Sequence, residues 1–313
     1  MILLSHKPLR EERSFYRISR ERRKRVVQPM TLAIGALCDV NGYSQTGAFV
    51  IGADTLVSYG DASSNERASK LYQLPHGFFC LIAGDISKAH EFVGRLHTGM
   101  DLISSDGNEF IEPVKKCLDN SLEYVRFWTR KEILAEACIT TDEFLHDRNL
   151  QGREELEERL KEANFSFRCI LAGFAPHGTP VLFEGDCLKI NEHASPGFVC
   201  IGTGAEAATD WLNFRKQHSF MSPQRTYYHV REALDFGRLS PFVGNTVNMQ
   251  LLRHGKPPCD VANLNPLLQE WVKAHYPRTT DDLDQPQAWR DFAATFGIPA
   301  SRLSESQTSA GPP

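Results

Sequence analysis

Three polar residues lie next to apolar segments, and together their side chains could form a hydrolytic site. Thr31 begins one apolar run, Asp54 ends the next run, and Lys70 opens a third. If these runs are adjacent antiparallel strands, their ends bring a hydroxyl, a carboxylate and an ammonium group together. Taken singly, each residue also has an ordinary structural explanation, because threonine is a good strand former, aspartate caps turns and lysine suits an exposed strand edge.

A threonine hydroxyl is a poor nucleophile at neutral pH and needs a base to activate it. A free α-amine has a pKa of about 7.7–8.0 and therefore titrates close to working pH. A neighbouring lysine would lower the pKa of the hydroxyl, and an aspartate would keep that lysine charged and oriented. This chemistry requires Thr31 to be the first residue of the mature chain.

The order of the predicted elements indicates the fold class. Clustered strands followed by clustered helices argue against a doubly wound sheet and favour an α+β fold of packed antiparallel sheets flanked by helices. Apolar runs and turn residues predict strands at 31–37, 48–53, 70–74, 78–83, 167–174, 180–183, 198–201 and 245–253. Helical periodicity predicts helices at 86–96, 109–135, 152–163, 205–216 and 223–236.

Composition and charge define three regions of the 313-residue chain. Residues 1–29 form a basic extension or propeptide that includes the dense basic run 20–25. Residues 30–258 form the main domain, in which 136–165 is an insertion. Residues 259–313 form a C-terminal extension, which is Ser/Gly/Pro-rich and expected to be disordered from about residue 304.

Several classes of partner and cofactor are not expected. The net charge of −4 gives no general reason for nucleic-acid binding, which would rest on the basic extension alone. No apolar stretch reaches the ~20 residues of a membrane span. The eight cysteines have no C-x-x-C spacing and lie mostly in apolar runs, so we expect buried, reduced thiols in a cytoplasmic protein with no metal site or cofactor.

Four short motifs in the first third of the chain resemble a proteasome β-subunit, a member of the N-terminal nucleophile (Ntn) hydrolase family. They are Thr31-Leu32-Ala33-Ile34-Gly35, Gly52-Ala53-Asp54, Ser69-Lys70-Leu71 and Ala83-Gly84-Asp85. In that family the catalytic Asp and Lys lie sixteen residues apart and a Gly follows fourteen later, which is the spacing of Asp54, Lys70 and Gly84. The resemblance covers roughly residues 30–255. Within the family, it extends to the bacterial proteasome-type peptidases.

Two later segments continue the resemblance. Residues 198–205 are similar to the family's Gly-Ser-Gly loop, with Thr203 at the serine position, and residues 243–248 are similar to its Ser-Gly-Gly entry to the last strand.

The resemblance implies a four-layer αββα sandwich and a threonine-type peptidase or amide hydrolase. In that reading Thr31 is the nucleophile, Asp54 and Lys70 tune it, and Thr203 supports it. The Gly84 N–H binds the oxyanion, and Ser58 hydrogen-bonds a peptide backbone.

The chain departs from the family pattern in several places. The first hairpin, 39–47, is longer than usual, and Ser240 and Val243 replace a supporting Asp and Ser. The register at the start is also open, because matching the Thr-Thr-Leu-Ala pattern puts Met30 at the nucleophile position. Matching the strand glycine to Gly35 puts Thr31 there, and we prefer this register because Thr31 alone offers a nucleophilic oxygen.

Residues 1–30 leave three readings open: a mis-called upstream extension, a propeptide that is cleaved, or a segment that persists. If the segment persists, the alternative function is a non-catalytic ring subunit of the α type. As partners we expect a peptide or protein substrate, a homo-oligomeric ring and an unidentified unfoldase. The apolar stripe Ile111, Val114, Leu118 and Leu122 is a candidate for the ring contact.

Overall fold

The structure is a computed structural model, and it describes most of the predicted main domain. The described residues are 31–38, 47–59, 63–65, 69–84, 86–104, 109–147, 150–163, 167–186, 188–237, 243–244 and 246–260. The predicted extension 1–29, Met30, most of the first hairpin, Asp85 of the Ala83-Gly84-Asp85 motif, Ser240 and the segment from 261 onward lie outside these ranges.

One sheet contains the strand that follows Thr31. Its order is β10-β1-β2-β11-β12, and all of its pairings are antiparallel. The strands are β1 (Leu32–Cys38), β2 (Ala48–Asp54), β10 (Phe198–Gly202), β11 (Val247–Arg253) and the two-residue β12 (Cys259–Asp260). Every residue of β2 is buried, as its unbroken apolar sequence predicts for a central strand covered on both faces. The expected pairing of the first two strands is confirmed.

The second sheet contains the strand that follows Lys70, and it is also antiparallel, with the order β5-β6-β7-β8-β9. Its strands are β5 (Leu71–Gln73), β6 (Phe79–Gly84), β7 (Phe167–Phe174), β8 (Pro180–Asp186) and β9 (Ile190–Glu192). A 3₁₀ turn, Pro75–Gly77, joins β5 to β6, where the sequence predicted a turn.

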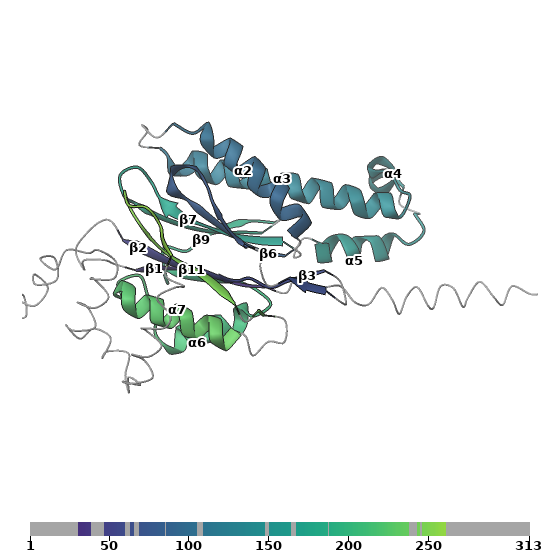
Figure 1. The fold of residues 1–313 in the computed structure, drawn as a ribbon. Helices are drawn as coiled ribbons and strands as arrows, with labels where there is room; N and C mark the ends of the chain where they lie inside the picture. The colour runs from purple at the N-terminus through teal and green to yellow at the C-terminus, as the bar shows by residue number, and fades with distance from the viewer. Residues whose placement is uncertain are drawn as a thin grey trace, which may run out of the picture.

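Each sheet carries two helices on its outer face (Figure 1). Helices α2 (Ile86–Asp101) and α3 (Ile111–Glu136) cover the second sheet, and α6 (Ala205–Phe214) and α7 (Pro223–Gly237) cover the first. Three apolar cores hold these layers together, one under each helix pair and one between the sheets. The chain is therefore an α+β protein with two antiparallel sheets, as predicted.

The predicted insertion 136–165 contains two helices. Helix α4 (Thr141–His146) and helix α5 (Arg153–Ala163) lie near the C-terminal end of α3 (Figure 1). Thr140 caps α4 with a capping box, in which its hydroxyl accepts from the Glu143 N–H and its own N–H donates to the Glu143 carboxylate. The sequence predicted α5 but not the short α4.

Besides the two-residue β12, three short strands were missed. The polar segment before Lys70 contains β3 (Val57–Tyr59) and β4 (Ser63–Asn65), which pair with each other in a two-stranded ribbon. Strand β9 was also missed at the edge of the second sheet. Each has three residues, too few to show an alternating apolar pattern.

The apolar stripe on α3 is part of the protein's own core, so its assignment as a ring contact is wrong. Val114, Leu118 and Leu122 are buried between the helix pair and the second sheet, and Ile111 packs against the same core. Among the described residues, the exposed phenylalanine and tryptophan side chains are instead Phe127, Trp128, Phe214, Phe220 and Phe236. Within the described part of the chain, no helix combines the length and hydropathy needed to cross a membrane.

Candidate active site

The ends of several strands meet at one end of the two sheets, and they position the predicted site residues. In the β1–β2 pair Ala33 lies opposite Ala53, so Asp54 at the end of β2 reaches the start of β1 beside Leu32. On the other side of β2, Asp54 pairs with Val247 at the start of β11. The antiparallel register therefore brings the carboxylate to the residue that follows Thr31.

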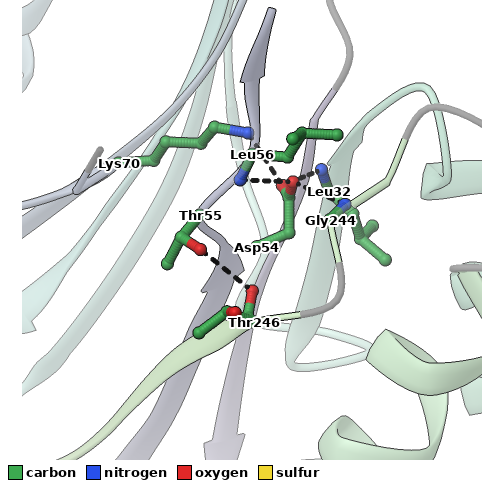
Figure 2. Close-up of polar contacts among 7 residues, drawn as sticks. All are labelled: Leu32, Asp54, Thr55, Leu56, Lys70, Gly244 and Thr246. Carbon is green, nitrogen blue, oxygen red and sulfur yellow. Dashed lines mark hydrogen bonds and ion pairs between the residues drawn. The ribbon is translucent and has the colours of Figure 1, made fainter. Parts of the chain in front are cut away.

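The Asp54 carboxylate accepts four hydrogen bonds from described residues (Figure 2). Its Oδ1 accepts from the backbone N–H of Leu32 at 2.7 Å and from Lys70 Nζ at 2.9 Å. Its Oδ2 accepts from the backbone N–H of Gly244 at 3.0 Å and of Leu56 at 3.2 Å. Asp54 is fully buried, so these four donors replace the water that an ionised carboxylate would otherwise bind.

Lys70 is held in place by its backbone and by its side chain. Its carbonyl accepts from the Ile82 N–H at 3.1 Å, which ties the residue to β6. Its ammonium group, 2% exposed at the side chain, forms the ion pair with Asp54 that the sequence predicted. Burial lowers the pKa of Lys70 below its ordinary value, and the charge and hydrogen bond of Asp54 oppose that shift.

Thr31 lies immediately before β1 and is 2% exposed. The Leu32 N–H that Asp54 binds belongs to the peptide group that joins Thr31 to β1. Because Lys70 donates to the same Oδ1, the two nitrogens are no farther apart than the sum of their two hydrogen-bond lengths. The Thr31–Leu32 peptide, Asp54 and Lys70 therefore form one cluster.

Gly202 at the end of β10 packs against the main chain of Thr31. A Cβ atom added to Gly202 would lie 2.0 Å from the Thr31 carbonyl oxygen and 3.4 Å from Ala83 Cβ, and its φ of +100° also favours glycine. This approach brings the ends of β10 and β6 to Thr31. Thr203, predicted as a supporting hydroxyl, is the residue after Gly202 and leads into α6.

Gly84 is the last residue of β6, directly after Ala83. Its φ of +126° lies in the region that L-amino acids with a side chain rarely adopt. It pairs with Phe167 of β7, and the Ile82–Lys70 hydrogen bond lies two residues earlier on the same strand. Gly84 is therefore at the same end of the sheets as Lys70 and Thr31.

The two remaining predicted positions are less closely placed. Ser58 lies in β3 opposite Ser64, and its side chain is outside the described part of the structure. Val243 is buried, and its Cγ2 lies 3.1 Å from the position of a Cβ atom added to Gly204. An apolar contact therefore stands where the family resemblance places a hydroxyl.

The sequence did not identify the backbone donors to Asp54. Leu32, Leu56 and Gly244 act through their N–H groups, so their side-chain types carry no sign of the role. Gly244 has a packing reason as well, because a Cβ atom there would lie 2.5 Å from Leu56 Cβ. The Gly-containing motif 243–248 was the available signal.

Among the described residues, no group of three or more His, Cys, Asp or Glu side chains is suited to hold a metal ion. Compared with known proteins, the chain matches no protein-family model. A search of curated proteins also finds no match.

Proposed function

We propose that this chain is an Ntn hydrolase of the proteasome β type, a threonine peptidase or related amide hydrolase with Thr31 as its nucleophile. The observation that carries the proposal is the Asp54 carboxylate, which binds both Lys70 Nζ and the Leu32 N–H. One buried carboxylate thus connects a lysine to the main chain of a threonine at a strand start. A helix pair outside each of two stacked sheets agrees with the four-layer αββα arrangement of this family.

The proposed reaction begins with attack of Thr31 Oγ on the carbonyl carbon of an amide substrate. The α-amine of Thr31, directly or through a water molecule, takes the hydroxyl proton and later delivers it to the leaving amine. The C–N bond breaks as the tetrahedral intermediate collapses to an ester on Thr31. Water, activated by the same amine, then hydrolyses the ester and releases the carboxylic acid.

Lys70 and Asp54 prepare the nucleophile in this mechanism. The ammonium group of Lys70 stabilises the developing alkoxide of Thr31 and so lowers the pKa of its hydroxyl. Asp54 keeps Lys70 protonated against the effect of its burial. The Gly84 N–H is the donor for the oxyanion, and the hydroxyl of Thr203, the residue after β10, is the supporting group.

The substrate class is a peptide or protein, and Ser58 is the proposed contact to the peptide backbone. A ring of identical subunits with a separate unfoldase would deliver extended substrate to Thr31. The ring contact must come from residues other than the α3 stripe, because that stripe is buried within the subunit.

The competing function is a non-catalytic subunit of such a ring. It is favoured by the thirty residues that precede Thr31 in the sequence. While they remain attached, the nitrogen of Thr31 is an amide whose lone pair is delocalised into the Met30 carbonyl, so it is not a base.

N-terminal sequencing and intact mass of the purified protein, combined with a fluorogenic peptide assay, distinguish the two functions. The proposal predicts that hydrolysis appears only in samples whose first residue is Thr31 and is lost in Thr31→Ala. A sample that begins at Thr31 and hydrolyses none of a diverse peptide library supports the non-catalytic subunit.

A further inference from the structure

Three turns enclose a cavity of about 320 Å³ at the end of the sheets opposite Thr31. His76 comes from the β5–β6 turn, Pro176 from the β7–β8 turn, Arg253 from the end of β11 and Lys256 from the β11–β12 turn. Asp54 pairs with the first residue of β11, whereas Arg253 is its last. Strand β11 has 7 residues, so at about 3.3 Å per residue its two ends are about 20 Å apart.

The cavity combines positive charge with apolar walls. Its charged lining residues are Arg253 and Lys256, joined by His76 and His254, and no Asp or Glu occurs among the described residues that line it. The apolar lining comes from Phe79, Phe174, Pro176, Leu252 and Pro258. Its volume lies at the lower end of the range of about 300–1,000 Å³ that is typical of small-molecule sites.

Arg253 supplies an observation independent of the cavity itself. Its Nε is buried and has no hydrogen-bond partner among the residues that the structure describes. A buried N–H of a guanidinium group without an acceptor carries a desolvation penalty. The guanidinium group of Arg253 therefore has hydrogen-bonding capacity that the described residues do not use.

The two histidines are fixed by backbone carbonyl groups. His254 Nε2 lies 3.1 Å from the Pro176 oxygen, and His76 Nε2 lies 3.0 Å from the Met100 oxygen. Each Nε2 must carry the proton in such a contact, because a carbonyl oxygen can only accept. The His254 ring also packs edge-to-face against the Phe174 ring. This contact joins the polar and apolar parts of the cavity.

We propose that this cavity binds a small organic anion, a carboxylate or phosphate attached to a compact apolar group. Arg253 and Lys256 pair with the anionic group, because a guanidinium group matches the geometry of carboxylate and phosphate oxygens. Phe79 and Phe174 contact the apolar body of the ligand. This site is separate from Thr31 and does not depend on the proposed hydrolase function.

Isothermal titration of the full chain with benzoate, phenyl phosphate and neutral benzamide tests the proposal. We expect one site per chain for at least one of the two anions, and at least tenfold weaker binding of benzamide. Binding of benzoate alone would identify a carboxylate site, and binding of phenyl phosphate alone would identify a phosphate-ester site.

Arg253→Gln should weaken the affinity for the anion about tenfold through loss of one charged hydrogen bond. Arg231→Gln, which removes an arginine paired with Asp235 on α7, is the matched control and should leave affinity unchanged.

Lys256→Gln provides a second variant at an exposed position, in case Arg253→Gln disturbs folding. It should also weaken anion binding, whereas Thr31→Ala should bind the anion as the unaltered chain does. The proposal is overturned if neither anion binds, if benzamide binds as tightly as they do, or if affinity is unchanged in both lining variants.

Discussion

Lys70 Nζ donates to Asp54 Oδ1 at 2.9 Å, and both side chains are almost completely buried from solvent. Exposed ion pairs contribute little to stability, but a buried pair behaves differently when one partner is removed. The remaining charge then has no counter-charge and little water. The pair therefore matters to the stability of this end of the molecule as well as to the proposed chemistry.

Asp54→Asn should strongly destabilise the protein. Each carboxylate oxygen accepts from two N–H donors, so the amide NH₂ of asparagine would face two donors in either orientation. Breaking a buried pair in this way costs about 3–5 kcal/mol. Urea denaturation followed by circular dichroism measures the change.

Asp235→Asn is the control, because Asp235 forms an ion pair with Arg231 at a more exposed position on α7. It should change the free energy of unfolding by less than about 1 kcal/mol. Equal effects of the two substitutions would show that the Asp54 hydrogen bonds do not support the fold as described.

The sequence predicted the main strands because their apolar runs are long enough to reveal burial, and it predicted Asp54 and Lys70 from their spacing in the family resemblance. It did not predict how the carboxylate is held, because three of its four donors are backbone N–H groups.

The apolar stripe on α3 shows another limit of the sequence. An apolar helical face predicts burial, but the sequence does not say whether the partner is the protein's own sheet or a second subunit. Cys138 was also expected to be buried and is exposed.

Gly202→Ala should displace Thr31. The added Cβ would lie 2.0 Å from the Thr31 carbonyl oxygen and 2.7 Å from its carbonyl carbon, and both atoms belong to the main chain. We expect a loss of several kcal/mol of stability, in the range of severe backbone and packing defects. Denaturant unfolding gives the stability, and peptide hydrolysis by the mature form should fall with it.

Gly152→Ala separates the clash from the backbone strain. Gly152 has a φ of +80°, but a Cβ atom there meets nothing within 4 Å. This substitution should therefore show only the cost of the left-handed conformation, about 1–2 kcal/mol. If Gly202→Ala lowers stability no more than Gly152→Ala does, β10 does not approach Thr31 as closely as described.

The buried His229 should make stability depend on acid pH. Its Nδ1 lies 2.8 Å from Gln217 Oε1, and burial, aided by the charges of Arg225, Arg215 and His218, lowers its pKa to about 3. Between this value and the ordinary 6.5, the unfolded state binds a proton that the folded state does not. The contribution of neutral His229 to stability is therefore fully present above pH 6.5. As the pH falls from 6.5 to about 3, the free energy of unfolding decreases by up to about 1.4 kcal/mol per pH unit.

Comparison with His229→Gln isolates this contribution. Glutamine does not titrate, so the stability difference between the two proteins should shift in favour of the variant as pH falls from 6.5. Urea midpoints at several pH values from 7.5 to about 4 measure this difference. A constant difference across the range would mean that His229 titrates normally in the folded state.

The most direct test of the central claim is covalent labelling of Thr31 by a peptide epoxyketone, read by intact mass and peptide mapping. A chain that begins at Thr31 should gain one adduct on that residue, because its hydroxyl and its free amine are both available to the reagent. Thr31→Ala should remove the adduct, and Lys70→Ala should slow labelling strongly by raising the pKa of the hydroxyl. The 313-residue chain with residues 1–30 attached should not react. Labelling of that full chain at another residue, or no labelling of a chain shown to begin at Thr31, would contradict the account.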